Sequence, residues 1–346
     1  MDVELLDSLL EALELPQLRF VRLDAYYEGT QANGFLNAEQ RKALGARLTH
    51  LSVNIPRLAV SSIAQRLFVQ GFAGVDVRED WYRNDLDQVQ DVVHKEALAL
   101  GCSYVMVWAD RLGRPKVTVE SARNVAVLKD PGTGDITAAI KVWDTETTTE
   151  ATVFLPDAVH RLRADRTGAK GANSFYVYAS LDNPLGVVPV VQFENLDRFT
   201  QHSEISDITD LVDGLNLALA DLAVAQAYNA RPRQWSTGVA LEERPVLDDE
   251  GNSVFDPETG DPLVETVNPI EPGMRSMVSE NDQAKFGQLD GSPLSGFEAA
   301  VRIWLSAIQA VTSLPASALG ILSDQPNSAD ALRAASAQLE AKAQNR

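Results

Sequence analysis

The chain has 346 residues, of which 45% are hydrophobic and 23% charged, so it can bury one large core or two smaller ones and is not globally disordered. Its 49 acidic and 30 basic residues give a formal net charge of −19, which argues against a protein that grips nucleic acid by neutralising phosphates. The single cysteine excludes an intrachain disulfide and indicates a reducing compartment. The acidic N-terminus is unlike a signal peptide, and no window of about 20 residues is apolar enough to span a bilayer. We therefore expect a soluble intracellular protein.

The first hundred residues carry helical patterns. Leucines at helical spacing are separated by acids, and Pro16 ends the first stretch. Asn37 can cap a second helix, Pro56 interrupts it, and Gly71 and Gly101 are natural helix ends. The periodicity predicts helices over 2–15, 37–51, 58–71 and 85–100.

From residue 103 the hydrophobic period becomes that of strands. β-branched and aromatic residues gather in short runs separated by turn sequences rich in glycine and proline. Pro189 makes the last of these strands an edge strand or a bulge. We expect an antiparallel sheet or small barrel with strands at 104–109, 116–120, 136–143, 151–155, 175–179 and 187–193.

Two long helices with an acidic insert between them are expected in the second half of the chain. The first spans 203–230, which corresponds to about 40 Å, and carries one leucine stripe and several alanine faces. Its acids exclude a membrane helix. Short strand-like runs follow at 235–241, 253–255 and 263–267. Between residues 239 and 290 there are 13 acids and three bases, about half of the excess charge of the chain.

A second apolar helix is expected over 297–314. A loop then leads to an alanine-rich helix that begins at about residue 328. The chain stops while this pattern is still helical, which suggests a truncated or incompletely ordered C-terminus.

The sequence lacks the motifs of the best-known enzyme classes. It has no G-x-x-x-x-G-K-[ST], H-E-x-x-H or G-x-S-x-G, and no G-x-G-x-x-G opens a helix after a strand. Cys102 follows Gly101 at a helix-to-strand junction, and a small buried residue explains it better than a nucleophile does. We expect no enzyme, no catalytic residue and no cofactor.

A metal site is not expected either. The four histidines fall in separate elements without paired spacing. The run from Asp248 to Asn252 lacks the alternating order of a calcium loop, and a hairpin turn explains it better. The acids of 239–290 either form an ordinary solvated surface or meet a basic partner or repel DNA; from charge alone the solvated surface is favoured.

Several stretches resemble the portal proteins of long-tailed bacteriophages, in particular the class found in phages of actinobacteria. Their order and spacing over most of the chain carry the resemblance. The stretches are Tyr26-Tyr-Glu-Gly29, the run from Asn54-Ile-Pro-Arg57 to Gln70-Gly-Phe72, Leu185-Gly-Val-Val-Pro-Val-Val-Gln-Phe-Glu-Asn195, Leu314-Pro-Ala-Ser-Ala-Leu-Gly320 and Ser328-Ala-Asp-Ala-Leu332.

The resemblance implies an α+β portal fold. It has a wing that mixes helices with antiparallel strands, two long stem helices, a small α/β clip inserted between them and a tunnel loop. A crown would follow the last helix, and the resemblance places almost none of it before Arg346. The implied parts are a wing at 1–202 (helical over 1–101, β-rich over 102–195), stem helices at 203–231 and 292–312, a clip at 232–291, a tunnel loop at 313–327 and a C-terminal helix at 328–346.

The resemblance also implies partners and a location. Portal proteins form a ring of about twelve identical subunits at one capsid vertex, around a channel for genome packaging and ejection. The implied partners are other copies of the chain, the major capsid protein and scaffold, the terminase, the head-to-tail adaptor and double-stranded DNA in the channel, with no membrane. The protein would be in the virion, at the portal vertex, and in the host cytoplasm during assembly.

Three groups of residues are assigned by the resemblance and by helical spacing. The stem stripe of the first long helix should pack on the second, while the alanine faces meet adjacent subunits. The groups are the DNA-facing tunnel loop (Ser323, Asp324, Gln325, Asn327), the stem packing (Leu211, Leu215, Leu219, Leu222, Phe297, Val301, Trp304, Ile308) and the clip surface for partners (Glu242, Glu243, Asp248, Asp249, Glu250).

DNA that slides through a channel must not be held by many phosphate contacts at once, because each neutralised phosphate strengthens binding. We therefore expect a net negative tunnel with few basic residues.

Two alternatives stay open from the sequence: a cytosolic hydrolase or transferase built from dispersed carboxylates, and a monomeric acidic scaffold or adaptor protein.

Overall fold

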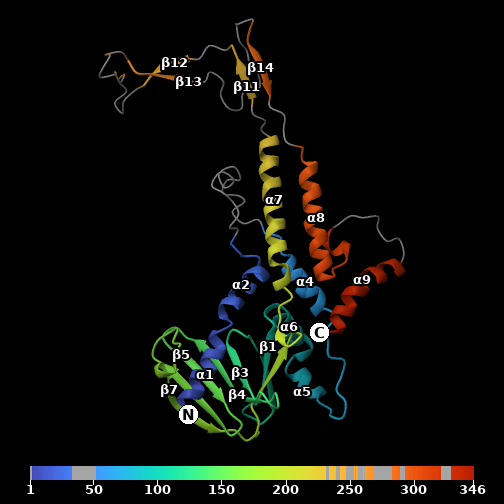
Figure 1. Ribbon diagram of the computed structural model, residues 1–346. Coiled ribbons are helices and arrows are strands. Elements are labelled where there is room, and N and C mark those ends of the chain that lie inside the picture. Colours follow the sequence, from blue (N-terminus) through green and yellow to red (C-terminus); the bar gives the residue numbers. More distant parts are fainter. Residues whose placement is uncertain are drawn as a thin grey trace.

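The computed structural model describes residues 2–32, 52–230, 293–320 and 329–346, with shorter pieces at 234–238, 242–246, 253, 255, 260, 262–267 and 283–288. Two antiparallel sheets and several helices form a body, and two long helices, α7 (Thr209–Ala230) and α8 (Ser295–Thr312), project from it side by side (Figure 1). Short two-stranded ribbons lie beyond the far ends of this pair (Figure 1). The described part is thus of the α+β class, as the sequence predicts.

The helices of the body begin and end at residues with the right local chemistry. The Asp2 carboxylate accepts a hydrogen bond from the Glu4 amide at 3.1 Å, and the Asn54 side chain caps α4 through the Arg57 amide at 3.2 Å. At the end of α6, Gly101 takes a left-handed φ of 99°. The bounds are α1 Val3–Glu14, α2 Gln17–Glu28, α4 Ile55–Ala64, α5 Arg78–Arg83 and α6 Leu86–Leu100.

The strands of the body form two main antiparallel sheets. One has the order β2-β1-β8, and the other has five strands in the order β3-β4-β5-β6-β7. The bounds are β1 Cys102–Ala109, β2 Pro115–Glu120, β3 Val125–Lys129, β4 Ile136–Asp144, β5 Thr149–Phe154, β6 Ala158–Ala164, β7 Tyr176–Asp182 and β8 Val190–Glu194, followed by the short ribbon β9 Leu196–Asp197 and β10 Thr200–Gln201.

The remaining elements of the described residues are 3-10 turns, short distal strands and the last helix. The 3-10 turns are η2 Ala172–Ser174, η3 Ser206–Ile208 and η4 Ala316–Leu319, the distal strands are β11 Gln234–Thr237, β12 Glu242–Pro245, β13 Val264–Val267 and β14 Lys285–Gln288, and the last helix is α9 Ala329–Gln344. β11 pairs with β14 and β12 with β13.

The expected helices at 2–15 and 85–100 are confirmed, whereas other elements differ. The helix expected over 58–71 ends at Ala64, and the first long helix begins at Thr209, after a 3-10 turn, rather than at residue 203. The sequence interpretation missed α2, α5, β3 and β6, as well as the short strands β9, β10, β12 and β14. The helix expected over 37–51 lies outside the described residues. The described residues of 232–291 form strands and a β-bridge, and most of the residues expected to form the α/β insert lie outside the described residues.

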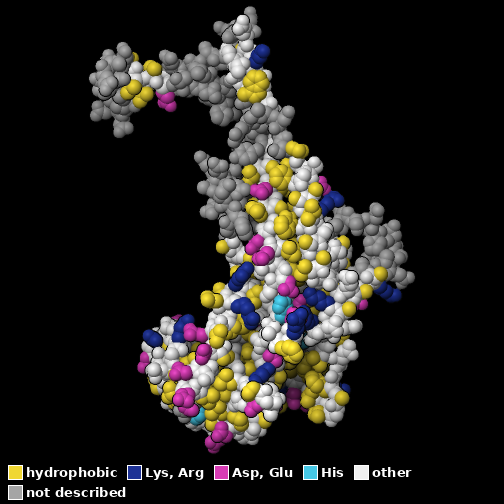
Figure 2. All heavy atoms as spheres, in the orientation of Figure 1, with side chains coloured by type: hydrophobic (Ala, Val, Ile, Leu, Met, Phe, Trp, Pro, Cys, Tyr) yellow, Lys and Arg dark blue, Asp and Glu magenta, His cyan; other side chains and the backbone are white. Residues whose placement is uncertain are grey.

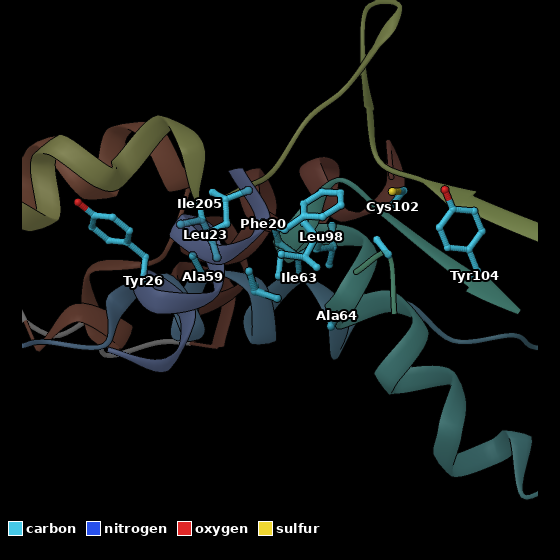
Figure 3. Packing of buried hydrophobic residues seen from close by; sticks show 14 of the residues in the cluster. Phe20, Leu23, Tyr26, Ala59, Ile63, Ala64, Leu98, Cys102, Tyr104 and Ile205 are labelled. Atoms are coloured by element: carbon cyan, nitrogen blue, oxygen red, sulfur yellow. The ribbon is translucent and has the colours of Figure 1, made fainter. Parts of the chain in front are cut away.

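One hydrophobic cluster joins the body to the long helices. It runs from Tyr26, past Ile205 and Phe20, to Cys102 and Tyr104 on β1 (Figure 3). The same cluster contains Val212 and Leu215 of α7, Ile308 of α8, and Leu339 and Ala343 of α9. A second cluster lies between α1 and the five-stranded sheet. The long helices are therefore part of the main core rather than an appendage to it.

Trp304 sets the closeness of α7 and α8. A Cβ atom added at Gly214 of α7 would lie 2.7 Å from the edge of the Trp304 indole, well inside van der Waals contact. The glycine thus leaves room for the ring inside helix α7. Alanine would have a higher intrinsic helix propensity at this position. Close packing of the two helices accounts for the glycine.

Gly214→Ala tests this packing. We expect it to lower the free energy of unfolding by about 1–3 kcal/mol, because the added methyl group overpacks the contact with Trp304. The matched control is Gly296→Ala in α8, where the added methyl group meets nothing within 4 Å; we expect it to be neutral or stabilising by up to about 1 kcal/mol. Chemical denaturation measures both. Equal stabilities of the two variants would contradict the close contact.

Candidate functional site

The lower half of α7 is fixed to the body by two polar contacts. The Tyr26 hydroxyl of α2 donates to the Asp213 carboxylate at 2.6 Å, and the Asn216 Oδ1 atom accepts from the Val53 amide at 3.0 Å. Burial together with the bond to Asp213 raises the pKa of Tyr26 to about 12, so the phenol stays protonated at neutral pH. These bonds hold one face of α7 on the body while another packs on α8.

A buried carboxylate connects the base of α7 to the last helix. The Glu204 side chain is 3% exposed and accepts from Lys342 Nζ at 2.7 Å and from Arg346 Nη2 at 2.6 Å. Asn195 Nδ2 donates to the same carboxylate at 3.1 Å. Burial works to raise the pKa of Glu204, but these bonds and charges hold it below its usual range. The carboxylate is therefore charged at neutral pH and anchors α9.

The backbone around Glu204 is tied to the end of α6. The Glu204 amide donates to the Leu98 carbonyl at 2.9 Å, and the Ser203 hydroxyl donates to the Ala99 carbonyl. Gly101 lies against this segment: a Cβ atom there would be 3.3 Å from the His202 nitrogen, on a backbone with positive φ. The entry to α7 is thus fixed by hydrogen bonds as well as by burial.

The end of α8 is anchored in the same core. Ser313 takes a left-handed conformation with a φ of 61°, and the buried Leu314 side chain follows it. The Thr312 hydroxyl donates to the Ile308 carbonyl at 2.8 Å and accepts from the Leu314 amide at 3.3 Å. The segment that leaves α8 toward residue 320 therefore starts from a fixed point.

The long helices also expose apolar side chains. Ile303 of α8 is 69% exposed and Val311 is 42% exposed, although both lie on a helix whose other side is packed. Figure 2 shows hydrophobic side chains along both helices on the visible face. Exposed apolar surface of this kind is typical of a protein contact.

The structure places the sequence-predicted stem residues on the facing helices. Leu215 and Ile308 are buried, and the other predicted stem residues that pack against their cluster are partly buried. Leu222 and Phe297 are half-buried and are not part of that cluster. The clustered residues of the predicted set are Leu211, Leu215, Leu219, Val301, Trp304 and Ile308.

The other predicted site residues are not brought together by what is described. The predicted tunnel-loop residues Ser323, Asp324, Gln325 and Asn327 lie outside the described residues, as do Asp248, Asp249 and Glu250. Glu242 and Glu243 begin strand β12, where only their backbone pairing with β13 is described.

Within the described residues, no cluster of three or more His, Cys, Asp and Glu side chains has the arrangement of a metal site. Nor is any helix among them long and apolar enough to cross a membrane. Cys102 is buried, and burial raises the pKa of its thiol to about 11. The thiol is thus protonated at neutral pH, as the interpretation of Cys102 as a small buried residue requires.

The sequence analysis missed the polar contacts that hold α9 at the base of α7. Glu204 lies far along the chain from Lys342 and Arg346, and each looks like an ordinary surface charge in the sequence. A weak signal exists, because Glu204 is followed by the apolar residue Ile205 at the start of a buried segment. That signal does not identify the partner.

Glu204→Gln tests the anchoring of α9. We expect a loss of about 1–3 kcal/mol in the free energy of unfolding and faster proteolysis near the C-terminus, because the neutral amide cannot pair with Lys342 and Arg346. The control is Glu298→Gln, which breaks an exposed pair with Arg302 and should cost under about 1 kcal/mol.

The contribution of Glu204 should also depend on pH. Its pKa in the folded protein lies below the ordinary value of 4.5, so the ionised form stabilises the fold above that value. The stabilisation is lost as pH falls below 4.5 through the folded-state pKa. Denaturation curves of the wild type and Glu204→Gln should therefore converge in acid. A constant difference down to low pH would contradict the assignment.

Comparison with known proteins identifies the family. The family model described as "Phage portal protein, SPP1 Gp6-like" matches residues 13–346. The portal protein of Mycobacterium phage L5 is 25% identical over 93% of this chain, and that of Mycobacterium phage D29 is 26% identical over 98%. The chain spans 66% of the length of the L5 protein and 70% of that of the D29 protein.

Solved structures of a gene transfer agent particle are also similar to this chain. One, described as the virion of a native gene transfer agent particle, has a TM-score of 0.42 and 16% identity and covers 92% of this chain and 74% of its own. Another, the neck of that particle computed with C12 symmetry, has a TM-score of 0.43 and 14% identity, with coverages of 92% and 75%. The assignment rests on the family model, which matches nearly the whole chain: the protein belongs to the SPP1 Gp6-like family of phage portal proteins.

Proposed function

We propose that this chain is the portal subunit of a long-tailed phage of the actinobacterial class. A ring of about twelve copies occupies one capsid vertex and surrounds the channel through which the genome is packaged and ejected. The observation that carries the proposal is the family match over residues 13–346, supported by relatives named portal proteins. The role is structural, without a catalytic site. No specific observation favours the alternatives of a hydrolase, a transferase or a monomeric scaffold.

In this proposal the parts of the chain take the roles expected from the sequence. Residues 1–202 form the wing, α7 and α8 are the stem helices, 232–291 is the clip and 313–327 is the tunnel loop. The acidic clip, with Glu242, Glu243, Asp248, Asp249 and Glu250, faces the terminase or the head-to-tail adaptor. The capsid protein and scaffold contact the ring from outside. The protein is in the virion and, during assembly, in the host cytoplasm.

The exposed apolar surface of the stem supports contacts between subunits. Ile303 is largely exposed in the single chain, and a charge buried there without a partner would cost several kcal/mol. The alanine-rich faces of α7 allow a neighbouring helix to approach closely. We therefore assign the ring contact to the sides of α7 and α8 that do not face each other.

Two substitutions test the stem. Leu215→Asp places an unpaired charge between α7 and α8, at a side chain that is 1% exposed, and should abolish ring formation. Ile303→Glu changes an exposed side chain, so the subunit should stay folded with an unchanged melting temperature while rings are lost. Light scattering coupled to negative-stain imaging measures both.

The control for the stem variants is Val3→Glu, which adds the same charge at an exposed apolar residue of α1, far from the stem. It should form rings normally. Rings from Leu215→Asp would contradict the packing of the stem helices, and rings from Ile303→Glu would contradict the assigned subunit contact.

The tunnel wall should hold DNA weakly. With a net charge of −19 and few basic residues proposed in the bore, duplex DNA should bind the ring with a shallow dependence on salt. Gln325, Asn327 and backbone groups of the tunnel loop, together with Ser323 and Asp324, are the proposed weak contacts. Fluorescence anisotropy at 50 and 200 mM salt measures this. A loss of about a thousandfold between these concentrations would indicate six or more phosphate contacts and contradict the low-adhesion wall.

A further inference from the structure

The hairpin that follows β8 carries a fully exposed aromatic ring at its tip. Pairing of Asp197 with Thr200 between β9 and β10 leaves Arg198 and Phe199 as the two turn residues. Phe199 is 98% exposed, and the exposed Arg198 forms no ion pair among the described residues. Figure 3 shows the chain leaving the core after β8 as a narrow loop that returns at Ile205. The tip therefore presents an apolar ring and a positive charge side by side.

The turn at this tip has a backbone conformation that favours glycine. Arg198 takes a left-handed φ of 56° at the first turn position, where two-residue hairpins with one left-handed residue prefer glycine. The turn between β1 and β2, by comparison, has its positive φ at Gly113. A strained arginine beside a fully exposed phenylalanine is typical of a tip that makes a contact.

The base of the hairpin is held in place by hydrogen bonds. The Asn195 carbonyl accepts from the His202 amide at 2.8 Å, and the Asn195 side chain donates to the His202 carbonyl at 2.8 Å. Arg346 Nη1 donates to the Leu196 carbonyl at 3.1 Å, and the same guanidinium pairs with the buried Glu204. The tip thus starts from a fixed base and loses little conformational freedom when it binds.

A hollow lined by aromatic side chains lies elsewhere on the same chain. It has a volume of about 540 Å³ and is formed by α5 and the segment before it. Its lining includes Val75, Tyr82 and the edge-to-face pair of Phe72 and Trp81, whose ring centroids are 5.3 Å apart. Phe72, Val75 and Tyr82 are each more than half exposed in the single chain. Such a hollow can accept a further aromatic ring.

The surroundings of the hollow are acidic. Residues 76–87 contain five acids and two arginines. Both arginines already pair with acids of the same stretch, whereas Asp85 and Asp87 form no ion pair among the described residues. The Asp85 amide donates to the carbonyl of Tyr82, so this acid lies beside the lining. An arginine that arrives with an aromatic ring is therefore favoured here.

We propose that Phe199 and Arg198 of one copy of the chain seat in the hollow beside α5 of the next copy. The occupant is a second copy because one chain carries both the basic aromatic tip and the acidic aromatic hollow. These are two different surfaces, so the contact is heterologous and can repeat from copy to copy. That the repeat closes into a ring rests on the proposed function. One buried phenylalanine covers roughly 150–250 Å², so the tip adds to the stem contact and does not replace it.

Cross-linking of introduced cysteines tests the contact directly. In a variant with both Phe199→Cys and Tyr82→Cys, a short bifunctional thiol reagent should join copies into a ladder of up to about twelve subunits on a denaturing gel. Each single variant is the matched control and should give only the monomer band, because its new cysteine meets none on the next copy. Cys102 should not react, since it is buried and burial raises the pKa of its thiol to about 11.

Substitutions at the tip measure its contribution to assembly. Phe199→Ala should raise the protein concentration at which half of the copies are assembled by at least about tenfold, because the buried ring is lost. Arg198→Glu should also weaken assembly, by a factor that shrinks as salt is added. Leu112→Ala and Arg111→Glu are the matched controls, because they form an exposed apolar and basic pair at the β1–β2 turn, and they should change nothing. Light scattering on dilution measures all four.

Several results would overturn the proposal. They are the absence of a ladder from the double variant, a ladder that stops at dimers, cross-links in a single variant, and unchanged assembly of Phe199→Ala. Melting temperatures establish that each variant is folded.

The outcome is separable from the portal assignment. Rings of the double variant that do not cross-link would refute the tip contact and leave the portal function standing. Open filaments that cross-link into a ladder well beyond twelve subunits would do the reverse.

Discussion

Simultaneous packing of α7 against α8 and against the body is the constraint on which the rest of this structure depends. Gly214 lets the Trp304 indole approach the α7 backbone, while Asp213 and Asn216 hydrogen-bond to Tyr26 and Val53 of the body. A helix fixed on two sides cannot swing independently of either neighbour. Because Leu215 and Ile308 belong to the same cluster as Phe20 and Leu100, displacing the helix pair would open the core of the body as well.

The buried charge at Glu204 extends this constraint to the end of the described chain. A carboxylate in an apolar junction is costly unless it is fully paired, and here Lys342, Arg346 and Asn195 satisfy it. The pairing fixes where α9 lies relative to the base of α7. In the proposed portal this means that the tunnel loop, expected over 313–327, begins at the anchored residues Ser313 and Leu314 and leads to a helix that is also anchored.

The sequence predicted the elements whose signals are local. α6 has an apolar face and a terminal glycine, Gly101, and α1 follows leucine periodicity, so both were found. α2 was missed because Arg19, Arg22 and Asp24 interrupt its apolar pattern. β6 was missed because His160, Arg161 and Arg163 alternate with its apolar residues, whereas β3 is a short apolar run with a strand-like signal that the sequence interpretation overlooked. The Glu204 cluster and the role of Gly214 depend on residues distant in sequence, and no local pattern reveals such contacts. Family resemblance supplied the function, which composition and spacing alone left open.

The central claim is that this chain builds a closed ring through heterologous contacts between its copies. The most direct measurement is the mass and symmetry of the purified wild-type protein, alone and together with its capsid proteins, by light scattering and electron imaging. The account predicts rings of about twelve subunits with a central channel. A protein that stays a monomer or two-fold dimer under both conditions would contradict it.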